Sequence, residues 1–270
     1  MSENSIIEFG NSKLFYQKSG KGSKHLLLFH GFGQNHQVFE PWTQQLSDTY
    51  TLYAFDIFFH GQSERTFREE PVEKSDWKEI IRLFLEENDI HHFSLLGFSM
   101  GGKFALCTLE LFSGKVDELF LLAPDGIKTS FWYSLATYPV ALRKLFKSMI
   151  DKPGRFHTIA QMANKLGLVD KGVLRFAQSQ MDSWEKRERV YYSWIVFRHF
   201  KFNMDSIARI INTRQIRVMM IIGKYDRIIT VKNMNRLMDK LTSADLKIID
   251  TGHNGIIVAS AELIGSVHKS

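Results

Sequence analysis

The chain of 270 residues has 44% hydrophobic residues, 24% charged residues and 5 prolines, which excludes disorder and collagen-like or mucin-like repeats. The single cysteine, Cys107, excludes a disulfide scaffold and favours a reducing, cytoplasmic location. The net charge of +6 would by itself favour acidic partners or nucleic acid. No apolar run approaches 18 residues, and the N-terminus lacks the basic and apolar segments of a signal peptide, so we expect no membrane span and no secretion signal.

Short apolar runs alternate with amphipathic ones along the chain, a pattern typical of a parallel sheet covered by helices. The apolar runs predict strands at 6–9, 14–17, 25–29, 51–55, 93–97, 118–123, 218–222 and 247–250. The amphipathic runs predict helices at 38–46, 76–87, 100–112, 231–240 and 256–267. Residues 26–29 and 218–222 are apolar at every position, so we expect both faces of the sheet to be covered.

The alternation is interrupted over residues 126–216, which predict an all-helical insertion. Its helical blocks are expected at 131–150, 157–166, 173–180, 184–200 and 206–211. Asp182, three residues before Glu185, resembles a capping box at the start of the block at 184–200. The sequence therefore predicts a core domain of residues 1–125 and 217–270, and a helical cap, or lid, of residues 126–216.

A glycine-rich turn around Ser99 follows one predicted strand and opens a predicted helix. The turn is Gly97-Phe98-Ser99-Met100-Gly101-Gly102. This strand–turn–helix setting is the one in which a nucleophilic serine lies on a sharp elbow, and glycines are needed there because a side chain would collide with nearby backbone. The N–H groups at the start of the helix are placed to receive negative charge.

A second glycine-containing turn, His30-Gly31-Phe32-Gly33, directly follows the strand predicted at 25–29. Glycines there let the backbone curl around a developing oxyanion, with amide donors of this turn completing what the Met100 N–H begins. We interpret His30 as a residue that orients the turn by hydrogen bonding.

A serine hydroxyl needs a base, and the base needs an orienting carboxylate. Asp226 follows the strand predicted at 218–222, and His253 follows the strand predicted at 247–250. Both therefore lie at the carboxyl ends of strands, on the same sheet edge as Ser99, where open α/β sheets place their sites. Asp125, which also lies at a strand end, is the alternative carboxylate.

These residues resemble those of α/β-hydrolase-fold serine hydrolases, in which the chain order is Ser, Asp, His. Residues 56–63 are similar to the family loop D-x-x-G-H-G-x-S, with Phe59 where glycine is usual. Thr230 stands where relatives often carry proline. The resemblance implies a mostly parallel, eight-stranded α/β sheet flanked by helices, with the cap inserted after the sixth strand.

The same resemblance implies roles for individual residues. Ser99 would be the nucleophile, His253 the base and Asp226 its orienter, with the backbone N–H groups of Phe32 and Met100 as oxyanion donors. No metal-ligand spacing is present and no cofactor is expected.

The expected activity is cleavage of a carboxylic ester, or a related acyl bond, of a small substrate through an acyl-enzyme. Carbon–carbon bond hydrolysis is one alternative with the same triad. A second is the chemistry of the menaquinone-pathway lyase, which often has arginine at the position of Lys103. A non-enzymatic ligand-binding protein on a hydrolase fold is the alternative from another class.

The insertion carries much of the basic and aromatic content. Residues 126–216 hold 14 of the 35 aromatic residues, with 16 Lys+Arg against 6 Asp+Glu, a net of +10, and the remainder has a net of −4. The aromatic residues form either a core of the cap itself or an apolar lid. The excess charge is therefore interpreted as a feature of substrate access, and no nucleic-acid-binding module is present. Inward-facing cations would favour an anionic substrate; the candidates are Arg143, Lys147, Arg189 and Arg198.

Overall fold

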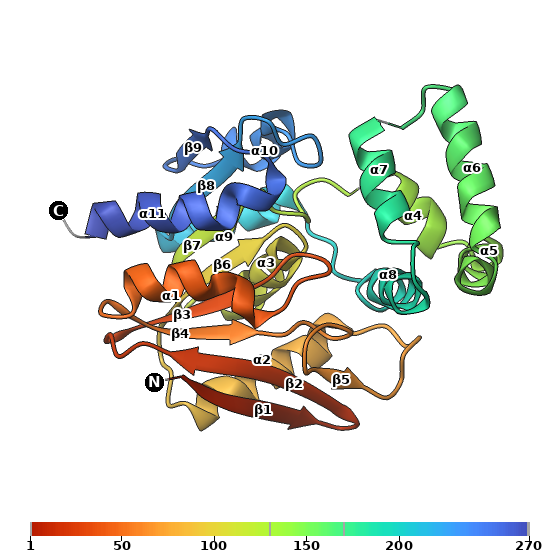
Figure 1. Cartoon of the computed structure of the whole chain (residues 1–270). Coiled ribbons are helices and arrows are strands. Elements are labelled where there is room, and N and C mark those ends of the chain that lie inside the picture. The colour runs from red at the N-terminus through yellow and green to blue at the C-terminus, as the bar shows by residue number, and fades with distance from the viewer. Residues whose placement is uncertain (1, 130, 170, 269–270) are drawn as a thin grey trace. The chain divides into compact units, whose positions relative to one another are not determined.

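The computed structural model describes residues 2–129, 131–169 and 171–268 (Figure 1). The chain divides into two compact units. The first comprises Met1–Phe67, Val72–Lys128 and Phe200–Ser270, and the second comprises Arg68–Pro71 and Thr129–His199. The unit boundaries thus lie inside residues 126–216, the segment for which the sequence predicts a cap, and a short stretch before residue 72 joins the second unit.

The first unit is built on one sheet with the strand order β1-β2-β4-β3-β6-β7-β8-β9. Its strands are β1 (Glu3–Phe9), β2 (Ser12–Ser19), β3 (Lys24–Phe29), β4 (Tyr50–Phe55), β6 (Phe93–Phe98), β7 (Val116–Leu122), β8 (Arg217–Gly223) and β9 (Asp245–Ile249). Strand β2 pairs antiparallel with β1 and β4, and the other pairs along this order are parallel. The mostly parallel sheet predicted from sequence is confirmed, and the two-residue strand β5 (Glu64–Arg65), which pairs with β2, was not predicted.

Helices cover both faces of this sheet, as the uninterrupted apolar strands require. The helices of the first unit are α1 (Glu40–Leu46), α2 (Lys74–Glu87), α3 (Gly101–Phe112), α9 (Met204–Arg214), α10 (Val231–Met238) and α11 (Ile256–His268). Helices α1 and α11 contact each other on one face, and α2 and α3 contact each other on the opposite face (Figure 1). A helix with the length and apolar character that crossing a membrane requires does not occur among the described residues.

Large aromatic side chains fill the core between the sheet and helices α2 and α3. The ring of Trp77 contacts Phe29 and Phe104, with centroids 5.8 and 5.0 Å apart, and its Nε1 donates to Thr108 Oγ1 at 2.9 Å. Cys107 is fully buried in helix α3, and this burial raises the pKa of its thiol. The single cysteine is therefore a core residue without the thiolate character of a nucleophile.

The second unit is helical, with α4 (Phe131–Thr137), α5 (Val140–Asp151), α6 (Pro153–Lys165), α7 (Lys171–Ser179) and α8 (Trp184–Val196). The helix predicted over 131–150 is divided because Pro139 takes an extended conformation with ψ 127° as the N-cap of α5. The helix N-cap predicted at Asp182 was wrong. The N-cap residue of α8 is Ser183, whose side chain accepts from the Lys186 N–H. Helix α9, which the sequence assigned to the insertion, falls in the first unit.

Aromatic residues of the second unit form a core of their own. Trp194 contacts the rings of Tyr133 and Phe146, with centroids 5.2 and 5.6 Å apart, and its carbonyl accepts from the Tyr133 hydroxyl. The Arg68 guanidinium lies 4.3 Å from the Tyr192 ring centroid, which ties the stretch Arg68–Pro71 to helix α8. These contacts favour the first of the two interpretations of the aromatic content.

Candidate active site

Ser99 lies between β6 and α3 with its backbone in the left-handed region, at φ +50°. Its N–H donates to the Leu122 carbonyl at 2.9 Å, and its carbonyl accepts from the Gly102 and Asp125 N–H groups at 2.9 and 2.8 Å. A non-glycine residue in this conformation costs about 1–2 kcal/mol, so the surrounding backbone must hold it there. The turn is therefore the sharp elbow that the sequence predicts.

Glycine is required beside this serine because backbone segments approach closely. A Cβ at Gly101 would lie 1.9 Å from the Phe29 carbonyl oxygen, and one at Gly97 would lie 2.7 Å from the Gly101 carbonyl oxygen. No side chain fits at either distance. The glycines thus let the first turn of α3 pass directly against the end of β3, where the second glycine-containing turn begins.

The structure brings together the three side chains that the sequence singled out. His253 Nε2 lies 3.0 Å from Ser99 Oγ, and His253 Nδ1 lies 2.6 Å from Asp226 Oδ2. His253 follows β9, Ser99 follows β6 and Asp226 follows β8, which places all three at the carboxyl ends of parallel strands. A continuous hydrogen-bonded path therefore runs from the serine hydroxyl to the carboxylate.

The Asp226 carboxylate is buried and its second oxygen is already engaged. Oδ1 accepts from the N–H groups of Ile228 and Ile229 at 2.8 and 2.9 Å, which leaves Oδ2 to face His253. Thr230, where relatives often carry proline, takes an extended conformation at the N-cap of α10. The loop therefore holds the carboxylate in one orientation with threonine at that position.

Asp125, the alternative carboxylate, does not meet His253. Its Oδ2 lies 2.8 Å from Nζ of Lys103, which is buried in helix α3, and its Oδ1 accepts from the Gly126 N–H at 2.7 Å. The structure thus directs Asp125 to a buried cation on the elbow helix. This pair leaves no signal in the sequence because the two residues come from different elements.

Two backbone N–H groups near the serine are free donors. Within the described part of the chain, the N–H groups of Phe32 and Met100 have no hydrogen-bond acceptor. Met100 is the N-cap residue of α3, where the helix dipole favours negative charge. Phe32 lies in a turn in which the Gly31 N–H donates to the Gln34 side chain at 3.0 Å.

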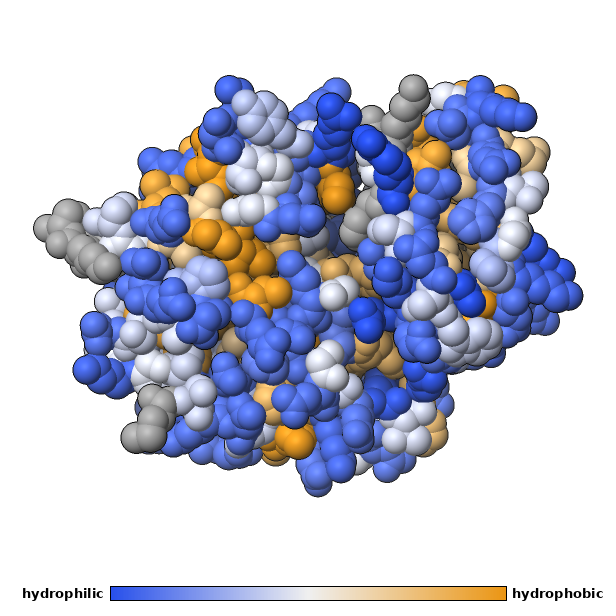
Figure 2. All heavy atoms as spheres, in the orientation of Figure 1, coloured by the Kyte–Doolittle hydropathy of each residue, from blue (hydrophilic) through white to orange (hydrophobic). Residues whose placement is uncertain are grey.

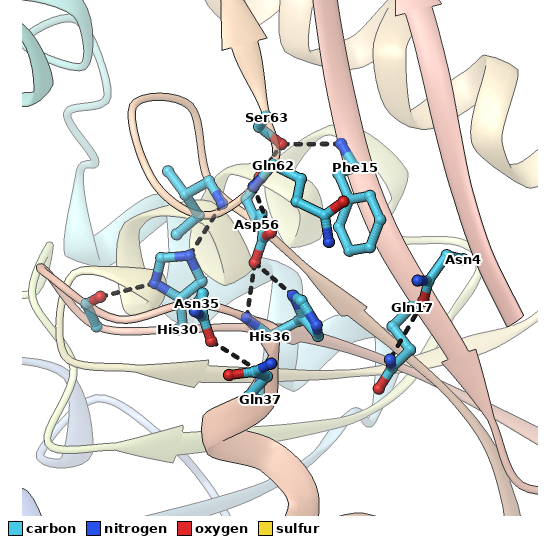
Figure 3. Close-up of polar contacts among 12 residues, drawn as sticks. Asn4, Phe15, Gln17, His30, Asn35, His36, Gln37, Asp56, Gln62 and Ser63 are labelled. Atoms are coloured by element: carbon cyan, nitrogen blue, oxygen red, sulfur yellow. Dashed lines mark hydrogen bonds and ion pairs between the residues drawn. The ribbon is translucent and has the colours of Figure 1, made fainter. Parts of the chain in front are cut away.

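His30 fixes this turn by hydrogen bonds, as the sequence predicts. Its Nδ1 lies 2.7 Å from the Gly31 carbonyl oxygen, and its Nε2 accepts from the Ile57 N–H at 3.0 Å (Figure 3). Because Nε2 accepts, the proton of a neutral ring must be on Nδ1, which donates to Gly31. His60 packs against both His30 and Phe32, with ring centroids 5.2 and 5.3 Å apart.

A buried carboxylate organises the loop after β4 (Figure 3). Asp56 Oδ1 accepts from the backbone N–H of His36 at 2.7 Å and lies 2.9 Å from His36 Nδ1. Asp56 Oδ2 accepts from the Gln62 N–H at 2.8 Å, and the backbone carbonyl of Asp56 accepts from the Ser63 hydroxyl at 2.5 Å. The role of His36 was not predicted from the sequence, because only the fold brings it to a carboxylate 20 positions away.

The departure at Phe59 has a conformational consequence. Phe59 has φ +70°, in the left-handed region where the glycine of the related loop is unstrained. Gly61 in the same loop has φ +52°. This chain therefore keeps a left-handed turn with a phenylalanine at one of its two left-handed positions.

The four cations proposed to face a substrate have different surroundings within the second unit. Lys147 is exposed and forms an ion pair with Glu69, and the Arg198 guanidinium donates to the Ile195 carbonyl. Arg143 and Arg189 are half-buried. Two of the four candidates are therefore engaged by protein groups.

Comparisons with known proteins agree with this fold. A family model described as alpha/beta hydrolase fold matches residues 24–260. The chain therefore belongs to the α/β hydrolase fold family. The mostly parallel sheet flanked by helices is the architecture expected for that family.

Individual relatives are distant. The Mycoplasma pneumoniae protein named "Putative esterase/lipase 3" is 26% identical over 157 residues, which are 57% of this chain and 54% of that protein. A pimeloyl-(acyl-carrier protein) methyl ester esterase of Aliivibrio salmonicida is 28% identical over 163 residues, 57% of each chain. The solved enol-lactonase from Burkholderia xenovorans is similar in fold, with a TM-score of 0.68 and 14% identity over 98% of both chains. The chain spans about half the length of the curated relatives it matches.

Replacing Gly61 tests the packing of the Asp56 loop. A Cβ at Gly61 would lie 1.9 Å from Asp56 Oδ2, whereas a Cβ at Gly10, with φ +54°, meets nothing within 4 Å. Gly61→Ala and Gly10→Ala both carry the left-handed penalty, but only the first displaces a buried carboxylate. We expect Gly61→Ala to lower the free energy of unfolding by about 2 kcal/mol more than Gly10→Ala, as measured by urea denaturation. Equal losses would show that Asp56 does not constrain the loop.

Proposed function

We propose that this chain is a serine hydrolase that cleaves a carboxylic ester, or a related acyl bond, of a small substrate. The observation that carries the proposal is the hydrogen-bonded path from Ser99 Oγ through both ring nitrogens of His253 to the buried carboxylate of Asp226. Nucleophile, base and orienter within hydrogen-bond reach of one another are the arrangement that makes a serine reactive near neutral pH.

In the acylation step, Ser99 Oγ attacks the carbonyl carbon of the substrate while its proton passes to His253 Nε2. The carbonyl oxygen becomes an oxyanion, which the free N–H groups of Phe32 and Met100 bind. Each such donor lowers the barrier by about 3–4 kcal/mol. His253 then gives its proton to the leaving alcohol, and an acyl-enzyme ester forms on Ser99.

Deacylation repeats these steps with water. His253 takes a proton from the water molecule, the resulting hydroxide attacks the acyl carbon, and the carboxylic acid leaves as Ser99 recovers its proton. Asp226 stabilises the imidazolium that forms in each half-reaction and holds Nδ1–H toward itself. Its fixed second oxygen, bound by two backbone N–H groups, prevents rotation of the carboxylate away from His253.

The ester class is supported by the names of relatives and by the state of Lys103. Two of the distant relatives carry esterase names. The menaquinone-type lyase often has arginine at this position, whereas here Lys103 is buried and ion-paired with Asp125. A purely ligand-binding role gives no reason to keep an aligned serine, histidine and carboxylate. We therefore place ester hydrolysis before carbon–carbon cleavage and before binding without chemistry.

Replacing the nucleophile is the first test. Ser99→Ala removes the only hydroxyl that contacts His253 Nε2 among the described residues. We expect the variant to lose labelling by a fluorophosphonate probe and to lose hydrolysis of p-nitrophenyl esters, to the level of the uncatalysed reaction. Ser266→Ala, on the exposed side of helix α11, is the matched control and should be labelled as fully as the parent protein. Labelling that survives Ser99→Ala would overturn the proposal.

The identity of the carboxylate is tested by two matched amide variants. Asp226→Asn removes the charge that stabilises the imidazolium and favours the wrong tautomer of His253, so kcat should fall by about three to four orders of magnitude. Asp125→Asn should keep kcat within about tenfold, but should unfold at lower urea concentration because the buried Lys103 cation loses its charged partner. Steady-state kinetics on an activated ester measures both variants. A larger loss of kcat in Asp125→Asn than in Asp226→Asn would show that Asp125, and not Asp226, is the carboxylate of the triad.

A further inference from the structure

Helix α6 keeps most of its large apolar side chains in solvent. Ile159 and Met162 of α6 are exposed by 41% and 58%, and Leu166, its C-cap residue, is exposed by 70%. Leu168, two residues further on, is exposed by 54%. Ala160 is the one residue of α6 that is buried. A helix that stabilises a core normally turns such residues inward, so this outward placement requires an explanation.

These side chains form a continuous line on one side of the helix. Positions 155, 159, 162 and 166 are spaced by four, three and four residues, the spacing that stacks side chains along one helical face. Arg155 begins the line and the three apolar residues continue it, so that the line from residue 155 to residue 166 is about 16 Å long. We call Ile159, Met162 and Leu166 the α6 stripe.

The surroundings of the α6 stripe are basic. Lys152, Arg155 and Lys165 are exposed beside it, and residues 152–169 include no aspartate or glutamate. The neighbouring helix α5 repeats the combination, with exposed Val140 and Leu145 near exposed Lys144. Figure 2 shows hydrophobic spheres between hydrophilic ones over the surface of this part of the chain.

Exposed apolar residues gather in the second unit. Among the described residues, twelve large hydrophobic side chains are exposed, and seven of them belong to this unit, which has fewer residues than the first. The seven are Val140, Leu145, Ile159, Met162, Leu166, Leu168 and Trp184. Single exposed apolar residues are common on proteins, but a helix with several of them among cations marks an interaction surface.

We propose that the α6 stripe docks on the surface of a lipid bilayer that contains anionic lipids. An interfacial helix places apolar side chains among the acyl chains and cations at the level of the headgroups, and the α6 stripe with its flanking cations has both parts. A second copy of the chain is a poorer occupant, because pairing two such stripes would bring Lys152, Arg155 and Lys165 against their own counterparts. This inference goes beyond ester hydrolysis and does not depend on it.

Vesicle co-sedimentation tests the proposal without using catalysis. The Ser99→Ala protein is mixed with vesicles of phosphatidylcholine alone, or with vesicles in which about one third of the lipid is phosphatidylglycerol. We expect binding to the anionic vesicles, and weaker binding as sodium chloride is raised from about 0.05 M to about 0.5 M. A failure of the proposed hydrolase activity leaves this result unchanged, so the two proposals stand or fall separately.

Two triple variants separate the apolar and ionic contributions. Ile159→Ser with Met162→Ser and Leu166→Ser should lower the fraction bound to anionic vesicles by at least about tenfold. Lys152→Ser with Arg155→Ser and Lys165→Ser should lower it by about a hundredfold, since each cation near the surface contributes about fivefold. Circular dichroism checks that each variant folds. If the apolar triple variant does not fold, the single variant Leu166→Ser should still lower the fraction bound to anionic vesicles.

The matched control uses exposed apolar residues of the first unit. Ile248 and Val258 are exposed by 54% and 50%, and replacing both with serine should leave vesicle binding unchanged. Three outcomes would overturn the proposal. The first is equal binding to neutral and anionic vesicles. The second is binding to anionic vesicles that the apolar triple variant does not weaken, which is the behaviour expected of a surface for an acidic protein partner. The third is self-association of the protein that the apolar triple variant abolishes.

Discussion

The left-handed backbone of Ser99 is the constraint on which the site depends. At φ +50° the chain turns sharply from β6 into α3, so the serine side chain leaves the sheet while the first N–H groups of the helix remain beside it. Hydrogen bonds to Leu122, Gly102 and Asp125 hold this conformation, and the close passage of Gly101 over the Phe29 carbonyl leaves no room for a side chain. Strain at one residue is thus balanced by the packing of three neighbouring strands.

Buried carboxylates extend this constraint to the surrounding loops. Asp226 is fixed by the N–H groups of Ile228 and Ile229, so its free oxygen can face only His253. Asp56 closes the loop after β4 through His36 and Gln62. Each carboxylate accepts several hydrogen bonds, which offsets the cost of removing the charge from water. The parallel sheet brings all of these loops to one edge, and backbone N–H groups of each loop hold its carboxylate in place.

The sequence predicts most of the first unit because its strands are short apolar runs between glycines and polar turns. Strand β5 was not predicted, because Glu64 and Arg65 are not apolar and pair with β2 only in the folded chain. Ser99, Asp226 and His253 could be found because each follows a recognisable strand. The pairing of Lys103 with Asp125 could not be found, because a contact between separate elements leaves no local periodicity. In the second unit, periodicity located the helices but missed the interruption at Pro139.

A crystal structure of the protein after reaction with a fluorophosphonate would show which residue is the nucleophile and which N–H groups bind the oxyanion. A phosphonate ester is tetrahedral, so its phosphoryl oxygen occupies the position of the oxyanion. We expect a covalent bond to Ser99 Oγ, with the phosphoryl oxygen within about 3 Å of the backbone nitrogens of both Phe32 and Met100. An adduct on another residue, or a phosphoryl oxygen directed away from these two N–H groups, would contradict it.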